Sequence, residues 1–180
     1  MKNILTSVAD FHPAVEEIDW QEVYDHCLPR VYHFFCYKVG NSVLAEDLSA
    51  ITFEKAWLSR RNFRKDIGLM PAWLMGIARN VASDHFRKRF REIPLEDESD
   101  RSFMPSFDED LQQKLDFQFI LSILAQYPER ERELIALKYG AELTNREIAR
   151  LAGLSETNVG TILHRVVEKL KVEWEKNHER

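Results

Sequence analysis

The sequence predicts an all-α protein with two small helical domains, the second carrying a helix-turn-helix. Apolar residues recur at helical spacing through most of the chain, and an acidic stretch containing Pro and Ser interrupts that periodicity. After this stretch, a short helix, a glycine turn and a longer capped helix follow one another. We therefore expect an N-terminal tail (1–17), a first domain (18–91), an acidic flexible linker (92–112) and a second domain (113–180).

Three helices are expected in the first domain. One covers residues 19–39, where Pro29 kinks or divides it. The next covers 43–59 and is apolar on two sides, which favours a helix packed between neighbours. One side comprises Leu44, Leu48, Ile51 and Leu58, and the other comprises Phe53 and Trp57. The third runs from Pro71 to Arg91, because Pro suits a first helical turn. Its core-facing stripe comprises Leu74, Ile77, Ala78, Val81 and His85.

Positive charge gathers before and along the third helix. Residues 60–91 hold nine Lys or Arg against two Asp or Glu, although the whole chain has a formal net charge of −5. Trp73, Asn80 and Arg87 align on a second face of the helix, which Arg91 continues. An aromatic ring, an amide and guanidinium groups can together bind a base and its phosphates. A buried Trp on a solvated basic helix is the alternative interpretation.

The second domain is expected to begin with helices over 111–126 and from Pro128 to Gly140. Thr144 and Glu147 match a capping box that starts a short helix. Gly153 makes the turn and Ser155 caps the next helix. Its buried stripe comprises Val159, Ile162, Leu163, Val166 and Leu170. This order of elements predicts a DNA-binding helix-turn-helix, with a nonspecific helical hairpin as the alternative.

Several functional classes find no support. No apolar run approaches the length of a membrane span, and the N-terminus lacks the pattern of a signal peptide, so a cytoplasmic location is the default. A Gly-rich phosphate loop, a zincin motif and a nucleophile motif are all missing, so we expect neither an enzyme nor a cofactor. Cys27 and Cys36, with His26 and His33 nearby, suggest either a metal site or core packing; their spacing favours packing.

Three stretches together identify a family: AEDLSAITFEKAW (45–57), AWLMGIARNVASDHFRKRFR (72–91) and YPERERELIALKYGAELTNREIARLAGLSETNVGTILHRVVEKLK (127–171). In order and spacing they resemble the extracytoplasmic-function (ECF) sigma factors of bacterial RNA polymerase. The resemblance implies a non-enzymatic subunit that directs core polymerase to promoters and opens them. It also implies a monomer without a small-molecule substrate, regulated by an anti-sigma factor.

The resemblance also implies site residues. Residues expected to bind core polymerase are Asp47, Thr52 and Glu54. Those expected at the minus-ten promoter element are Arg61, Phe63, Arg64, Lys65, Arg79, Asn80, Ser83, Arg87, Lys88 and Arg91. Those expected at the minus-thirty-five element are Ser155, Glu156, Thr157, Asn158, Thr161, His164 and Arg165.

Two departures from the family pattern affect these expectations. Ala50-Ile51 replaces the usual Gln-Glu pair in the polymerase-binding helix, and Gly160 and Ile162 stand where cations are common. Two fewer cations would lower the salt dependence of DNA binding by up to about two units. We therefore expect the second domain to bind DNA weakly by itself. The alternative function is a free-standing helix-turn-helix regulator, which would bind duplex promoter DNA without polymerase.

Overall fold

The computed structural model describes residues 18–64, 69–92 and 111–178. Every regular element in these ranges is helical. The elements are α1 (Trp20–Val39), α2 (Ser42–Leu58), η1 (Arg60–Asn62), α3 (Met70–Glu92), α4 (Leu111–Leu124), α5 (Glu129–Ile135), η2 (Ala136–Gly140), α6 (Asn145–Ala152) and α7 (Glu156–His178). We call α1 to α3 the first half and α4 to α7 the second half. The predicted linker falls almost entirely on residues 93–110, which lie outside the described ranges, as does the predicted tail.

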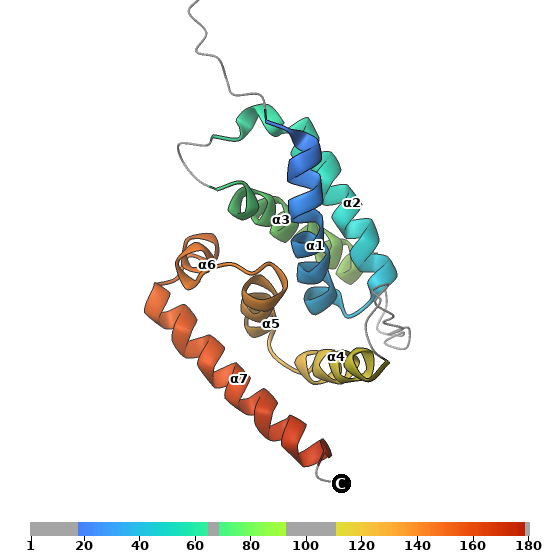
Figure 1. The fold of residues 1–180 in the computed structure, drawn as a ribbon, viewed down its shortest axis with the longest axis vertical. Helices are drawn as coiled ribbons and strands as arrows, with labels where there is room; N and C mark the ends of the chain where they lie inside the picture. Colours follow the sequence, from blue (N-terminus) through green and yellow to red (C-terminus); the bar gives the residue numbers. More distant parts are fainter. Residues whose placement is uncertain (1–17, 65–68, 93–110, 179–180) are drawn as a thin grey trace, which may run out of the picture.

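The two halves pack against each other around a shared core. In Figure 1, α5 and α6 lie directly below α1 and α3, while α7 runs away along one side of the molecule. One continuous cluster of buried residues includes Phe34 and Phe35 of α1, Leu137 of η2 and Val159 of α7. The sequence predicted two separate helical units, and the structure adds that their apolar faces are buried together.

Gly140 marks the closest approach between the halves. A Cβ atom at this position would lie 2.8 Å from the backbone N of Phe34 and 2.9 Å from the backbone C and O of His33. Because real Cβ atoms essentially never come so close to backbone, only glycine fits here without movement. The backbone of η2 therefore rests directly on that of α1.

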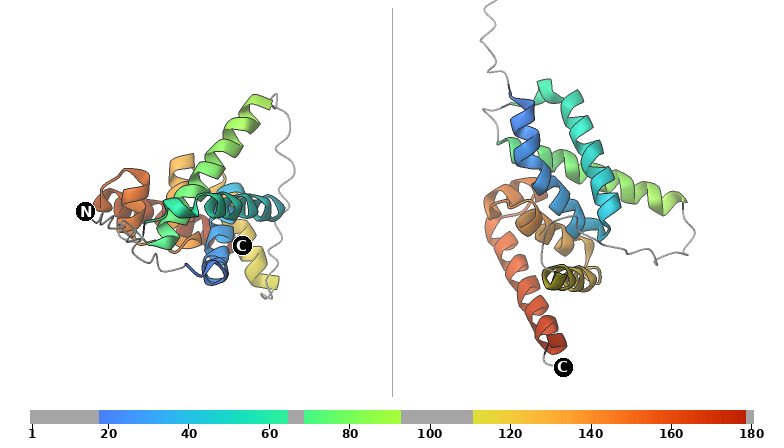
Figure 2. Two further views of the ribbon diagram at one scale, coloured as in Figure 1. Left: turned by 90° about the horizontal axis from the view of Figure 1, so that it is seen from above. Right: turned by 45° about the vertical axis from the view of Figure 1, so that its right-hand side comes forward.

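The first half is built on α1, which is one continuous helix despite Pro29. The helix is therefore not divided at this proline, and the expected kink stays a prediction. The Asp19 side chain caps α1 by accepting hydrogen bonds from the backbone N–H groups of Gln21 and Glu22. Figure 2 shows that the C-terminal part of α3 projects beyond the other helices.

The prediction that α2 is packed between neighbours is confirmed in part, because α2 packs against α1 and α3 but one of its two apolar sides is open. Small residues, Ala45 and Ala56, lie on its buried side together with Leu48, and they allow close packing against α1 and α3. Ile51 is 40% exposed and Leu58 is 72% exposed on the outer face. One face of α2 is therefore available for binding.

Local signals in the second half are confirmed. Thr144 and Glu147 form the complete capping box that begins α6. Gly153 adopts the left-handed conformation (φ 65°) in the turn before α7. The Ser155 hydroxyl accepts a hydrogen bond of 3.2 Å from the backbone N–H of Asn158. None of the described helices is long and apolar enough to cross a membrane.

Candidate nucleic-acid interface

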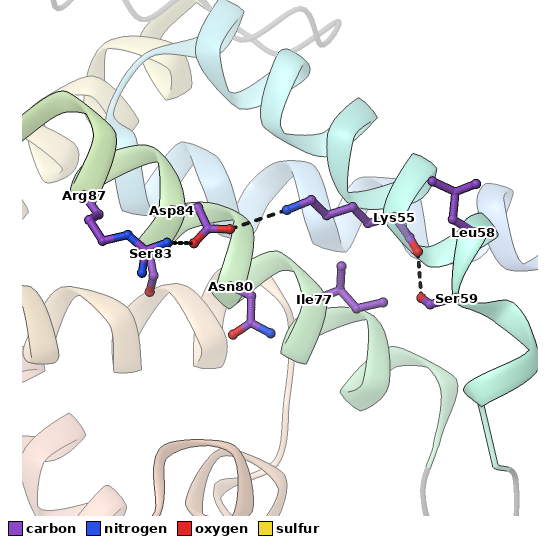
Figure 3. A pocket seen from close by; sticks show the side chains of 8 residues that line it. All are labelled: Lys55, Leu58, Ser59, Ile77, Asn80, Ser83, Asp84 and Arg87. Atoms are coloured by element: carbon purple, nitrogen blue, oxygen red, sulfur yellow. Dashed lines mark hydrogen bonds and ion pairs between the residues drawn. The ribbon is translucent and has the colours of Figure 1, made fainter. Parts of the chain in front are cut away.

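An open groove of about 650 Å³ lies between α2 and α3 in the first half. We call it the α2–α3 groove; it is lined by Lys55, Leu58, Ser59, Ile77, Asn80, Ser83, Asp84 and Arg87. In Figure 3, Asn80, Ser83 and Arg87 come from α3, and Lys55 and Leu58 come from the facing helix α2. The side chains of Asn80 and Ser83 are exposed. The groove thus combines an amide, hydroxyl groups and apolar walls, which can receive a planar polar ligand such as a base.

A carboxylate ties the two cations of this groove together. Asp84 Oδ1 lies 2.7 Å from Arg87 Nη2, and Asp84 Oδ2 lies 3.5 Å from Lys55 Nζ (Figure 3). All three side chains are about half exposed or more, so these pairs contribute little to stability. Their effect is to hold two positive groups at the rim, leaving a net charge of about +1 beside Asn80.

An aromatic cluster lies at the C-terminal end of α2, next to the groove-lining residues Lys55 and Leu58. The Trp73 ring contacts the rings of Phe63 and Trp20, with centroid distances of 5.4 Å and 6.5 Å. Trp57 is 49% exposed, and the Arg60 guanidinium lies 4.1 Å above its ring. Trp73 and Phe63 therefore support one another, while Trp57 with Arg60 presents a surface that the sequence had not singled out.

The other residues predicted at the minus-ten element divide into three groups. Arg61 of η1, Arg64, and Lys88 of α3 are exposed. Arg91 belongs to the last turn of α3, and Lys65 lies outside the described residues. Arg79 differs from all of these: its Nε donates to Glu133 Oε1 at 2.6 Å, and its Nη1 donates to the carbonyl of Leu151. The Arg79 side chain therefore points into the contact between the two halves and away from the groove.

The surface of the helix-turn-helix agrees well with the sequence pattern. All residues predicted at the minus-thirty-five element are exposed; we call them the recognition face: Ser155, Glu156, Thr157, Asn158, Thr161, His164 and Arg165. The Arg165 guanidinium is engaged by Glu131 Oε1 at 2.5 Å. Gly160 does not belong to this face, because its nearest neighbour is Asn145 Nδ2 of α6, 3.6 Å from a Cβ built there.

Of the three residues of α2 predicted to contact polymerase, two are exposed and one is buried. Asp47 and Glu54 are exposed on the same side as Ala50 and Ile51. Thr52 is fully buried, and its hydroxyl donates a 2.8 Å hydrogen bond to the Leu48 carbonyl. The structure therefore places Thr52 in the core instead of on a binding surface, because it follows the buried stripe of the helix.

Sequence reasoning missed part of the α2–α3 groove. Lys55 and Ser59 carried no functional expectation, and Leu58 and Ile77 were assigned to apolar stripes. The available signal was the pair of opposite charges Lys55 and Asp84, but nothing in the sequence places α2 beside α3 at this point.

The cysteines form no site of their own. Burial raises the pKa of the Cys27 thiol and raises that of Cys36 to about 12, so both thiols stay protonated at neutral pH. Across the described residues, no group of three or more His, Cys, Asp and Glu side chains is placed to hold a metal ion. Both cysteines are buried in the packing of α1.

Two family models match the chain. Sigma-70 region 2 matches residues 23–92, and Sigma-70, region 4 matches residues 120–170. The first match contains the α2–α3 groove and the second contains the helix-turn-helix.

Known relatives resemble most of the chain. The ECF RNA polymerase sigma factor SigM of Bacillus subtilis is 27% identical, with 83% of this chain and 91% of that protein covered. The ECF RNA polymerase sigma factor BldN of Streptomyces coelicolor is 31% identical, with 82% and 57% covered. Among solved structures, the sigma factor RpoE in complex with the anti-sigma factor NepR from Bartonella quintana matches with a TM-score of 0.68 and 26% identity, over 85% of this chain and 94% of that one.

Proposed function

This chain belongs to the sigma-70 family as an ECF sigma factor, and from that premise we propose which of its surfaces bind promoter DNA and which binds core polymerase. Sigma factors are non-catalytic initiation factors that direct core RNA polymerase to specific promoters. The observation that carries the proposal is the presence, in one chain, of a groove suited to a base in the region 2 match and an exposed recognition face in the region 4 match. The chain itself performs no catalysis and needs no cofactor.

The α2–α3 groove receives an unstacked base of the minus-ten element. Asn80 offers both a donor and an acceptor to a base edge, and Ser83 adds a hydroxyl. Lys55 and Arg87 at the rim bind the flanking phosphates. An unstacked base costs a few kcal/mol to expose, and these contacts offset that cost only when the strands have separated. The groove thereby favours the open promoter.

The recognition face of α7 enters the major groove of the minus-thirty-five element. Thr157, Asn158 and Thr161 lie on its first turns, from which side chains reach base edges. His164 and Arg165 follow one turn later and meet the sugar-phosphate backbone. The absence of a Lys or Arg at positions 160 and 162 keeps the affinity of this face for DNA low.

The outer face of α2 binds core polymerase. Asp47 and Glu54 supply negative charge, and Ile51 supplies apolar area in the middle of the same face. Such a face fits a basic helical surface with an apolar centre. With Ile51 in place of an acidic residue, this contact depends more on apolar burial and less on charge.

The regulatory partner is an anti-sigma factor. A related structure, RpoE of Bartonella quintana, is in complex with the anti-sigma factor NepR, and it aligns with both halves of this chain. We assign the chain to the cytoplasm as a monomer, with a first domain over 18–91, a linker over 92–112 and a second domain over 113–180.

Run-off transcription tests this function directly. Purified bacterial core polymerase would be combined with the protein and a library of genomic promoters. Discrete new transcripts that share upstream motifs are the expected result. A protein that binds duplex promoter DNA tightly without polymerase, and yields no transcript with it, would instead be a free-standing regulator.

A further inference from the structure

Helix α5 presents three acidic side chains to three different helices. The ion pairs are Glu129 with Lys38 of α1 at 3.2 Å, Glu131 with Arg165 of α7 at 2.5 Å, and Glu133 with Arg79 of α3 at 2.6 Å. The helix is short, and its acidic residues alternate along the sequence ERERE. A single small element therefore binds cations from both halves.

Two of these three cations are expected to bind promoter DNA. Arg79 and Arg165 were assigned to DNA from the sequence, whereas Lys38 is buried and was assigned no such role. Arg79 is 25% exposed and its partner Glu133 is 21% exposed. Arg79 also donates to the Leu151 carbonyl, so its guanidinium is engaged on two sides by the second half.

A carboxylate and a phosphate compete for the same guanidinium edge. Both are planar or tetrahedral oxyanions that accept paired hydrogen bonds from arginine. Glu131 is only 14% exposed, so its pair with Arg165 is screened less than an ordinary surface pair. DNA that binds Arg79 or Arg165 must therefore displace a glutamate and leave that carboxylate without its partner.

We propose that α5 acts as an internal competitor for nucleic acid. In the packed arrangement of the two halves, Glu133 and Glu131 occupy Arg79 and Arg165 and lower the affinity of the free protein for DNA. The inference rests on the proposed function, which assigns Arg165 to the promoter, and on the sequence-based expectation that Arg79 binds promoter DNA. Separation of the halves releases Arg79 from Glu133. Arg165 and Glu131 lie in the same half, so a DNA phosphate can replace Glu131 at Arg165 without separation of the halves.

Three matched substitutions in the full chain test the proposal: Glu129→Gln, Glu131→Gln and Glu133→Gln. Each removes one negative charge from the same helix and keeps the side-chain size. The probe is a fluorescein-labelled DNA duplex of random sequence, because phosphate contacts do not depend on sequence. Binding is followed by fluorescence anisotropy over a series of salt concentrations, and circular dichroism checks that each variant is folded.

The competitor model predicts a particular pattern. Glu131→Gln and Glu133→Gln each tighten DNA binding roughly fivefold and steepen the logarithmic salt dependence by about one unit, since each frees one cation. Glu129→Gln changes affinity by less than about twofold, because its partner Lys38 is buried and presents no free cation to a phosphate. Equal gains in all three variants would reduce the effect to general charge and refute the proposal. If DNA affinity rises in Glu129→Gln and Glu133→Gln but not in Glu131→Gln, the effect comes from weaker packing between the halves. That result would also refute the proposal.

Run-off transcription with the wild-type protein separates this inference from the proposed function. If the wild type transcribes and the three variants bind DNA alike, only the competitor model fails. If the wild type neither binds core polymerase nor supports transcription, the proposed function fails and the inference falls with it.

Discussion

Substitution of Gly140 by alanine should strain the contact that joins the two halves. The new Cβ would lie 2.8 Å from the Phe34 backbone N, and ordinary contact begins near 3.4 Å, so the backbones of η2 and α1 must separate by about 0.6 Å. The neighbouring side chains Phe34, Phe35 and Leu137 are fully buried, so separation loosens a packed core. Overpacking of this kind costs about 1–3 kcal/mol. Alanine returns up to about 1 kcal/mol through its helix propensity, so the expected net loss is about 1 kcal/mol.

Thermal unfolding followed by circular dichroism measures this effect. A loss of about 1 kcal/mol lowers Tm by about 2–4 °C in a protein of this size. Gly76→Ala and Gly160→Ala are matched controls, since the nearest atoms to their new Cβ lie 3.9 Å and 3.6 Å away. Both controls should raise Tm by a similar amount through propensity alone. A rise in Tm for Gly140→Ala equal to that of the controls would refute the close contact between the halves.

Three further outcomes follow from the site and the core. Asn80→Ala should reduce promoter opening, measured by permanganate footprinting, with polymerase binding unchanged; equal loss of both would contradict its role in the groove. Thr52→Val should leave polymerase binding intact because the hydroxyl is buried, whereas Asp47→Ala should weaken it in the same pull-down. Burial raises the pKa of Cys36 to about 12, so roughly one thiol in ten thousand is ionised at pH 8. Iodoacetamide should therefore label Cys36 only after urea unfolding. Rapid labelling of Cys36 in the folded protein would contradict its burial in the core.

Local chemistry explains why several elements were predictable. The capping box of Thr144 and Glu147 and the left-handed turn at Gly153 each depend on residues within a few positions of one another. The buried stripe of α7 repeats every three or four residues, and Val159, Leu163 and Val166 are indeed buried. The outward face of the same helix follows by geometry, and all seven residues of the recognition face are exposed.

Apolar patterning was less reliable where a helix packs through small residues. On α2, Ile51 and Leu58 suggested a buried side, but the core instead takes up Ala45, Thr52 and Ala56. Because α1 and α3 approach α2 closely, small side chains are favoured at the contact. The large apolar side chains Ile51 and Leu58 remain exposed on the outer face. Hydrophobicity alone does not predict this preference for small side chains, because the preference depends on the distance to the neighbouring helix.

The sequence by itself determined the all-helical class and the helix-turn-helix, because periodicity and caps are properties of short segments, and the resemblance of its three motifs indicated the ECF sigma factor group. Only the tertiary structure decided that α2 and α3 enclose a groove beside Asn80. It also decided that Arg79 and Arg165 are held by glutamates of α5. Such pairs join residues far apart in the chain, and which cation meets which carboxylate depends on how the two halves pack around their shared core.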